Sequence, residues 1–244
     1  MTVAVIAMML FAIAFFGASL LFPLYFQEVR GESALGAGLL LAPQGIGAMI
    51  TMPIAGFLAD KIGPGKIVLT GISVVTIGMG MFTQISADTP YLYIVGALFV
   101  MGLGMGGTMM PIMSAALATL SDHNIARGST FLNINQQVAA SIGTALFSVL
   151  LTNGFKDSPS IRLDGAATAL ADQPAKLSAL LAKAGLSTQD LEALHARALV
   201  DMADAFSTVF VVATILVACC LIPAFFLPRK KAERVVDPVA MAGH

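Results

Sequence analysis

Six long stretches without charge dominate the pattern of hydrophobic and polar positions along the chain. Each has about 20 residues or more, the length that an α-helix needs to cross a hydrocarbon core of about 30 Å. Strands of a membrane barrel would instead alternate polar and apolar residues over about 10 positions. The pattern therefore predicts an all-α integral membrane protein, with six transmembrane helices at residues 3–26, 34–58, 67–85, 91–120, 129–152 and 205–227.

A long loop interrupts this series of spans. Residues 1–152 would contain the first five spans and residues 205–228 the sixth, with the loop at 153–204 between them. Within the loop, residues 175–184 and 187–203 have the apolar spacing of helices. We expect two short amphipathic helices there, over the outer face, either as a passive hairpin or as a lid.

Composition agrees with a membrane protein, and the distribution of charge adds an orientation. Charged residues make up 11% of the chain, against about a quarter in soluble domains. The short loops on one side contain Lys61, Lys66 and Arg127, and a basic tail at 229–244 follows the sixth span; the short loops on the other side contain only Arg30. Because basic loops stay in the cytoplasm, both ends of this chain are predicted to be cytoplasmic, in a cell membrane.

The first span begins at Met1 without a basic flank. A signal peptide would have a charged start and an apolar stretch of only about 7–15 residues. We therefore expect the chain to be a C-terminal piece of a longer protein. Its six spans divide into three plus three, and an odd number of spans per unit makes the second unit inverted, as in the repeats of one large class of transporters.

The tight loop between spans two and three is the most specific motif. Gly56 and Gly63 suit a close helix approach and a tight turn. Asp60, beside Lys61, stands at a membrane face, where it can pair with a basic residue or a helix N-terminus. Such a contact can form in one state of a transporter and break in another. We predict a conformational-switch loop; a simple basic inner loop is the alternative.

Residues 56–66 resemble the signature loop of the major facilitator superfamily, G-x-L-A-D-[RK]-x-G-[RK]-[RK], although Pro64 and Gly65 replace its basic pair. Residues 28–43, 102–111 and 126–145 are similar to the C-terminal half of fourteen-span drug:proton antiporters of the EmrB/QacA type. The resemblance implies one major-facilitator-type half-bundle of an exporter of drugs or other amphipathic compounds, driven by the proton gradient. It also implies about eight further spans on the N-terminal side.

Span five carries a polar stripe at helical spacing. Amide side chains are costly in hydrocarbon unless they meet partners or water, so the stripe has to face other helices or a cavity. Hydrogen bonding between helices is the alternative to a substrate-facing role. With Gln44 of span two, the predicted substrate-pathway residues are Gln44, Thr130, Asn133, Gln136, Gln137 and Ser141.

Span four combines glycines, a proline and methionines. Gly102 and Gly106 fit the small-xxx-small pattern of helix packing, and Pro111 predicts a kink. A nucleotide site at the glycines is not expected, since no strand precedes them and no acidic partner follows. Methionines on one face of this span predict either an adaptable substrate wall or ordinary packing: Met105, Met109 and Met113.

No span centre contains Asp, Glu, His, Lys or Arg. A proton-coupled transporter needs an ionisable group within its pathway, so the coupling residues are expected in the missing part. We predict the C-terminal half of a proton-driven multidrug efflux transporter that works by alternating access. Its partners would be an amphipathic small molecule, the N-terminal half and the lipid bilayer, with no metal, cofactor or nucleic acid. A non-transporting scaffold or an inactive truncated product is the main alternative. A membrane enzyme is not expected, because the sequence has no motif of clustered nucleophiles, acids or metal ligands.

Overall fold

The computed structural model describes residues 2–117 and 122–226. Within these ranges, six helical segments are long and apolar enough to cross a membrane. The predicted all-α architecture with six spans is confirmed, whereas the basic tail at 229–244 lies outside the described residues. The six segments are Val5–Glu28, Ala34–Ile62, Pro64–Gln84, Tyr91–Ser114, Arg127–Asp157 and Thr188–Phe225.

Span one is not a regular helix. It consists of α1 (Thr2–Phe11), a π-helical turn η1 (Ala12–Phe16), α2 (Gly17–Ser19) and α3 (Leu21–Glu28). Single π-helical turns inside α-helices are local irregularities of the hydrogen-bond ladder. Here the irregular turn lies where span one crosses α8 (Asp122–Asp157), the helix of span five.

Spans two and three are joined by a single residue. The helix α4 (Ala34–Ile62) is capped by Ser33, whose hydroxyl accepts a hydrogen bond from the Gly36 amide. Gly63 then reverses the chain with a φ of 91°, a value that favours glycine. The next helix α5 (Pro64–Met81) starts directly with its proline and continues into the 3₁₀ turn η2 (Phe82–Gln84).

Span four is interrupted. The helix α6 (Tyr91–Gly106) stops at Gly107, and α7 (Met109–Leu117) resumes after Thr108. Pro111 has no amide hydrogen for the Gly107 carbonyl and its ring would collide with that group, so the interruption lies one turn before the proline. At the interruption, the Thr108 hydroxyl donates a hydrogen bond to the Gly104 carbonyl at 2.7 Å.

The second half of the chain differs from the predicted boundaries. The helix α8 (Asp122–Asp157) includes residues predicted as an inner loop at 121–128. The predicted surface helix at 187–203 is wrong as a separate element, because α11 (Leu191–Cys219) runs through it into span six. Charged residues are compatible with that helix where it extends beyond the bilayer: its 29 residues span about 44 Å, more than the hydrocarbon core.

The loop between spans five and six is largely helical. It contains α9 (Pro159–Ala169), which was not predicted, and α10 (Pro174–Lys183), which covers nearly the predicted residues 175–184. The turn η3 (Thr188–Asp190) leads into α11, and the short α12 (Leu221–Phe225) ends span six.

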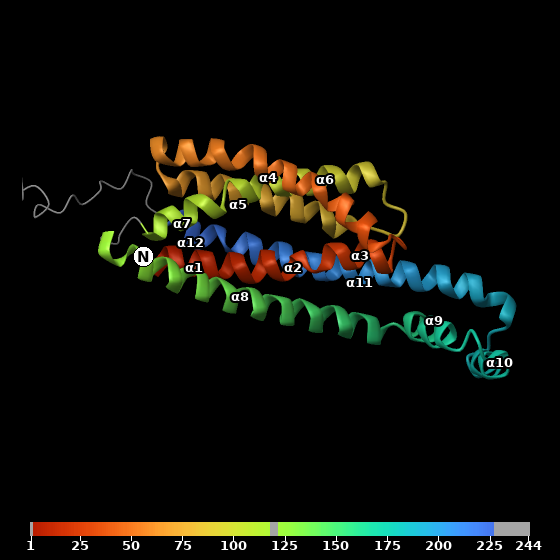
Figure 1. The fold of residues 1–244 in the computed structure, drawn as a ribbon. Coiled ribbons are helices and arrows are strands. Elements are labelled where there is room, and N and C mark those ends of the chain that lie inside the picture. The colour runs from red at the N-terminus through yellow and green to blue at the C-terminus, as the bar shows by residue number, and fades with distance from the viewer. Residues whose placement is uncertain (1, 118–121, 227–244) are drawn as a thin grey trace, which may run out of the picture.

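The spans pack side by side with roughly parallel axes (Figure 1). The helices α4, α5 and α6 lie along one side, and α1 to α3 and α8 along the other; α11 packs against helices of both groups. Phe22, Phe82 and Phe210 join spans one, three and six in the core, with ring centroids 4.8–5.2 Å apart. Aromatic contacts of this kind add to the stability that burial provides.

Candidate functional site

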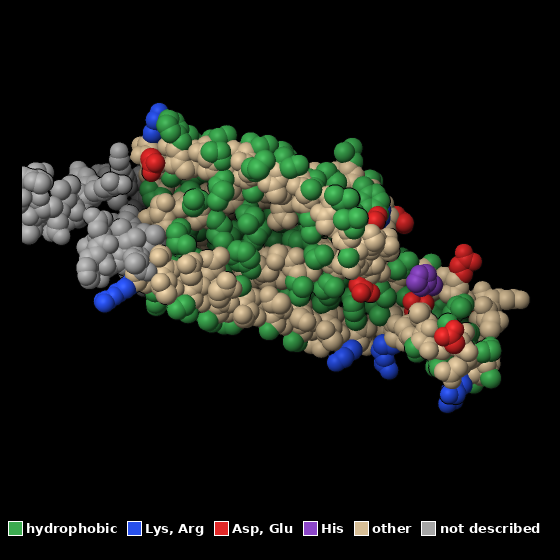
Figure 2. All heavy atoms as spheres, in the orientation of Figure 1, with side chains coloured by type: hydrophobic (Ala, Val, Ile, Leu, Met, Phe, Trp, Pro, Cys, Tyr) green, Lys and Arg blue, Asp and Glu red, His purple; other side chains and the backbone are tan. Residues whose placement is uncertain are grey.

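Two helices, α4 and α8, are more exposed than the other spans. Only 11% of the most apolar window of α4 is buried and 22% of that of Arg127–Asp157 in α8, against 33–56% in the other four spans. The two helices lie at opposite margins of the molecule in Figure 1. Figure 2 shows the surface between them hollowed, with hydrophobic side chains at the floor.

The predicted polar stripe lies on the exposed side of α8. Asn133, Gln137 and Ser141 are exposed, as is Thr130, while Gln136 is half-buried. The Ser141 hydroxyl donates to the carbonyl of Gln137 at 3.0 Å, inside the helix. Among the residues that the structure describes, the amides of Asn133, Gln136 and Gln137 make no hydrogen bond. They therefore leave amide donors and acceptors unpaired on a membrane helix.

The opposite face of α8 is fixed by a close crossing with span one. A Cβ atom on Gly143 would lie 2.1 Å from the carbonyl oxygen of Ile13, and one on Gly17 would lie 2.5 Å from the carbonyl carbon of Gly143. Leu132 and Phe147 are fully buried on this side of the helix. This packing turns the polar stripe of α8 away from span one.

Glycines bring α6 against α4. A Cβ atom on Gly102 would lie 2.1 Å from the Gln44 carbonyl oxygen, and one on Gly106 would lie 2.6 Å from that of Ala48. Gln44 itself is half-buried in α4. The structure does not bring Gln44 and the α8 stripe together, because the two helices occupy opposite margins of the hollow (Figure 1).

The signature loop stands at one end of the bundle. Asp60 and Lys61 are both exposed. The Lys61 ammonium lies 4.2 Å from the Phe57 ring centroid, and Asp60 has no ion pair or hydrogen bond within the described ranges. Gly56 was expected to allow a close helix approach. Among the described residues this is wrong, because a Cβ atom at Gly56 would meet no atom within 4 Å.

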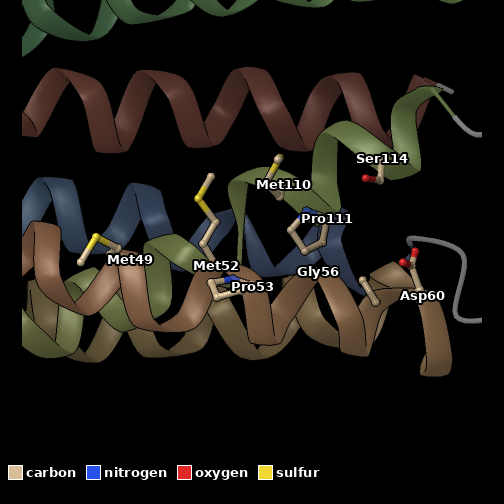
Figure 3. A pocket seen from close by; sticks show the side chains of 9 residues that line it. Met49, Met52, Pro53, Gly56, Asp60, Met110, Pro111 and Ser114 are labelled. Atoms are coloured by element: carbon tan, nitrogen blue, oxygen red, sulfur yellow. The ribbon is translucent and has the colours of Figure 1, made fainter.

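Gly56 instead lines a pocket between α4 and α7, of about 460 Å³ (Figure 3). Met49 and Met52 come from α4, and Met110 and Pro111 from α7. Asp60 and the Ser114 hydroxyl lie at one end of it. Its volume suits a small organic molecule, and thioether side chains adapt to irregular shapes.

The methionines predicted to form either a substrate wall or ordinary packing do not line this pocket. Met105, Met109 and Met113 are half-buried and pack against the core. Met110 lies next in sequence to one of them but lines the pocket, together with two methionines of α4. Which methionines of α4 and α7 lie together depends on how the two helices approach each other. The spacing of methionines within one span does not predict this approach.

No group of three or more His, Cys, Asp or Glu side chains in the described part of the chain could hold a metal ion. The polar groups exposed on α8 are its amides and hydroxyls, and those that line the pocket are Asp60 and Ser114. Such groups suit binding and orientation of a ligand by hydrogen bonds on a mainly apolar surface.

Comparison with known proteins decides the family. Residues 1–144 match the family model of the Major Facilitator Superfamily. The chain belongs to this superfamily. The predicted resemblance to its multidrug exporters is also confirmed: this major facilitator chain is 43% identical, over 237 residues, to the multidrug resistance protein B homolog of Mycobacterium tuberculosis strain H37Rv. That alignment covers 96% of the chain and 44% of the relative.

Two further relatives of the major facilitator chain are more distant. It is 36% identical over 141 residues to the uncharacterized MFS-type transporter YhcA of Bacillus subtilis, covering 58% of the chain and 26% of the relative. It is 33% identical over 137 residues to the lincomycin resistance protein LmrB of Listeria innocua, covering 56% and 29%. The chain thus spans less than half the length of these relatives.

Proposed function

We propose that this chain is the C-terminal half of a multidrug efflux transporter, and that an N-terminal half completes it. The observation that carries the proposal is the set of unpaired amides on the exposed side of α8, at Asn133, Gln136 and Gln137. Polar side chains at membrane depth have to meet other helices or a water-filled cavity. The names of the mycobacterial and listerial relatives, a multidrug and a lincomycin resistance protein, support drugs as the substrates.

In this proposal the hollow between α4 and α8 is one wall of the transport pathway. The α8 amides and hydroxyls would hydrogen-bond polar groups of an amphipathic substrate, and the methionine-lined pocket would accept an apolar part. Transport proceeds by alternating access, in which the two halves rock around a site near the middle of the membrane. Asp60 and Lys61, exposed at the end of α4, would contact the other half in one state only.

The energy source would be the proton gradient, coupled through residues of the N-terminal half. The centres of the six spans contain no Asp, Glu, His, Lys or Arg, and a proton carrier has to exchange protons within the pathway. This chain would therefore supply substrate contacts and moving helices. Its basic inner loops favour a position in the cell membrane with both ends of the chain cytoplasmic.

Efflux from vesicles tests the energy source. Vesicles with both halves should expel a fluorescent amphipathic dye when a proton gradient is imposed. A protonophore added at the same dye concentration should reduce efflux to the level of protein-free vesicles, because the driving force is removed. Efflux that persists after the gradient has collapsed would contradict proton coupling, and no efflux under any gradient would favour the inactive scaffold.

A further inference from the structure

The hairpin of α9 and α10 has a basic pocket on one side. This pocket, of about 470 Å³, lies between the two helices. Its charged lining residues are Arg162 and Lys183, both exposed, and no acidic side chain lines it. Leu163 and Leu180, half-buried, supply apolar surface between them. Two cations beside an apolar floor suit a ligand that is anionic and amphipathic.

Two acidic side chains line the other side of the hairpin, toward α11. A second pocket there, of about 520 Å³, is lined by Asp164, Glu192 and His195. Asp164 is buried and its carboxylate lies 3.0 Å from Nδ1 of His195. The carboxylate nearest in sequence to Arg162 is therefore engaged elsewhere, so that the positive charge of the basic pocket is not neutralised from within α9.

The basic pocket lies where span five ends. Only Ser158 separates the end of α8 at Asp157 from the start of α9. The Ser158 hydroxyl donates to Asp201 of α11 at 2.7 Å, and the Ser160 hydroxyl bonds the same carboxylate oxygen. The hairpin is thereby held at the end of the bundle. Figure 2 shows Lys and Arg side chains along the margin below the end of α8, α9 and α10, with the histidine and adjacent acidic side chains toward α11.

We propose that this pocket binds the headgroup of an anionic phospholipid from the adjacent leaflet. The Arg162 guanidinium can donate two parallel hydrogen bonds to one phosphate, and the Lys183 ammonium adds a second positive charge. The leucine floor would contact the glycerol and the first carbons of the acyl chains. Bound in this way, the hairpin stays against the bilayer surface and does not fold over the hollow as a lid.

The absence of tryptophan from the chain allows a test with a single introduced fluorophore. A Leu180→Trp variant of the whole chain is reconstituted in vesicles that contain brominated phosphatidylglycerol or brominated phosphatidylcholine, whose bromine atoms quench nearby tryptophan. Brominated phosphatidylglycerol should quench more strongly. Adding Arg162→Gln and Lys183→Gln should weaken the apparent affinity for it roughly 25-fold, because each basic group near an anionic surface contributes about fivefold.

Two controls match these variants. Lys176→Gln removes an α10 charge that lines neither pocket and should preserve the preference. Leu177→Trp places the fluorophore in the acidic pocket and should give no preference for the anionic lipid. Equal quenching by the two lipids at Leu180→Trp, no quenching by either, or a preference that survives removal of both basic groups would overturn the proposal. None of these readouts requires transport, so they are independent of the efflux experiment.

Discussion

A Gly102→Ala variant should be less stable than the unmodified protein, although only one methyl group is added. The new Cβ atom would lie 2.1 Å from the Gln44 carbonyl oxygen and 2.8 Å from the carbonyl carbon. Both are backbone atoms, so no side chain can turn aside and α4 has to move away from α6. Overpacking of this kind costs about 1–3 kcal/mol and sometimes more. The loss outweighs the gain of about 1 kcal/mol that alanine has over glycine inside a helix.

Gly96→Ala in the same helix is the matched control. A Cβ atom at Gly96 would meet no atom within 4 Å, so the helix propensity of alanine remains the main effect. Thermal unfolding of detergent-solubilised protein, followed by size-exclusion chromatography, measures both variants. The apparent melting temperature should fall for Gly102→Ala and stay equal or rise for Gly96→Ala. Equal behaviour of the two variants would mean that α4 and α6 do not cross as closely as described.

An Asn133→Leu variant, joined to the N-terminal half, should reach the membrane in normal amount but expel dye about threefold to eighteenfold more slowly. The amide is exposed on the α8 stripe and has no partner within the described residues. Hydrogen bonds between polar groups in membrane helices contribute about 0.6–1.7 kcal/mol, which sets this range. Leucine keeps a similar size and removes the ability to bond a substrate or the other half.

Asn135→Leu provides the matched control in the same helix. The Asn135 amide lies off the stripe and donates to the Phe131 carbonyl of its own helix at 2.8 Å. Its loss should therefore leave efflux within about twofold of the unmodified protein, since only a local bond is removed. Dye efflux rates, normalised to protein in the vesicles, compare the two variants. A larger loss of dye efflux for Asn135→Leu than for Asn133→Leu would contradict the proposal that the stripe is part of the transport pathway.

Features that depend on solvation could be predicted from the sequence. A charge-free run of about 20 residues has few other uses than crossing a membrane, and all six spans were found in this way. The exposure of Asn133 and Gln137 on one side of α8 also follows from helical spacing together with the close crossing at Gly143. The periodicity identifies a stripe, but the packed opposite face determines its direction.

Features that depend on where the bilayer ends or on how two helices approach could not be predicted. Glu192 and Asp201 were predicted to lie on a separate surface helix, but they lie on α11, which continues into span six. At Gly56, the residue type suggested close packing, whereas the neighbouring helix leaves a pocket. Glycine in a membrane helix permits close contact without requiring it.

Whether this chain is half of a transporter can be decided by comparing efflux from three vesicle preparations. They contain this chain alone, the proposed N-terminal half alone, and both halves together, each with the same dye and the same imposed proton gradient. We expect efflux only when both halves are present, because the α8 amides and the exposed α4 surface need the other half to enclose a pathway. Efflux by this chain alone, or by none of the three preparations, would contradict this expectation.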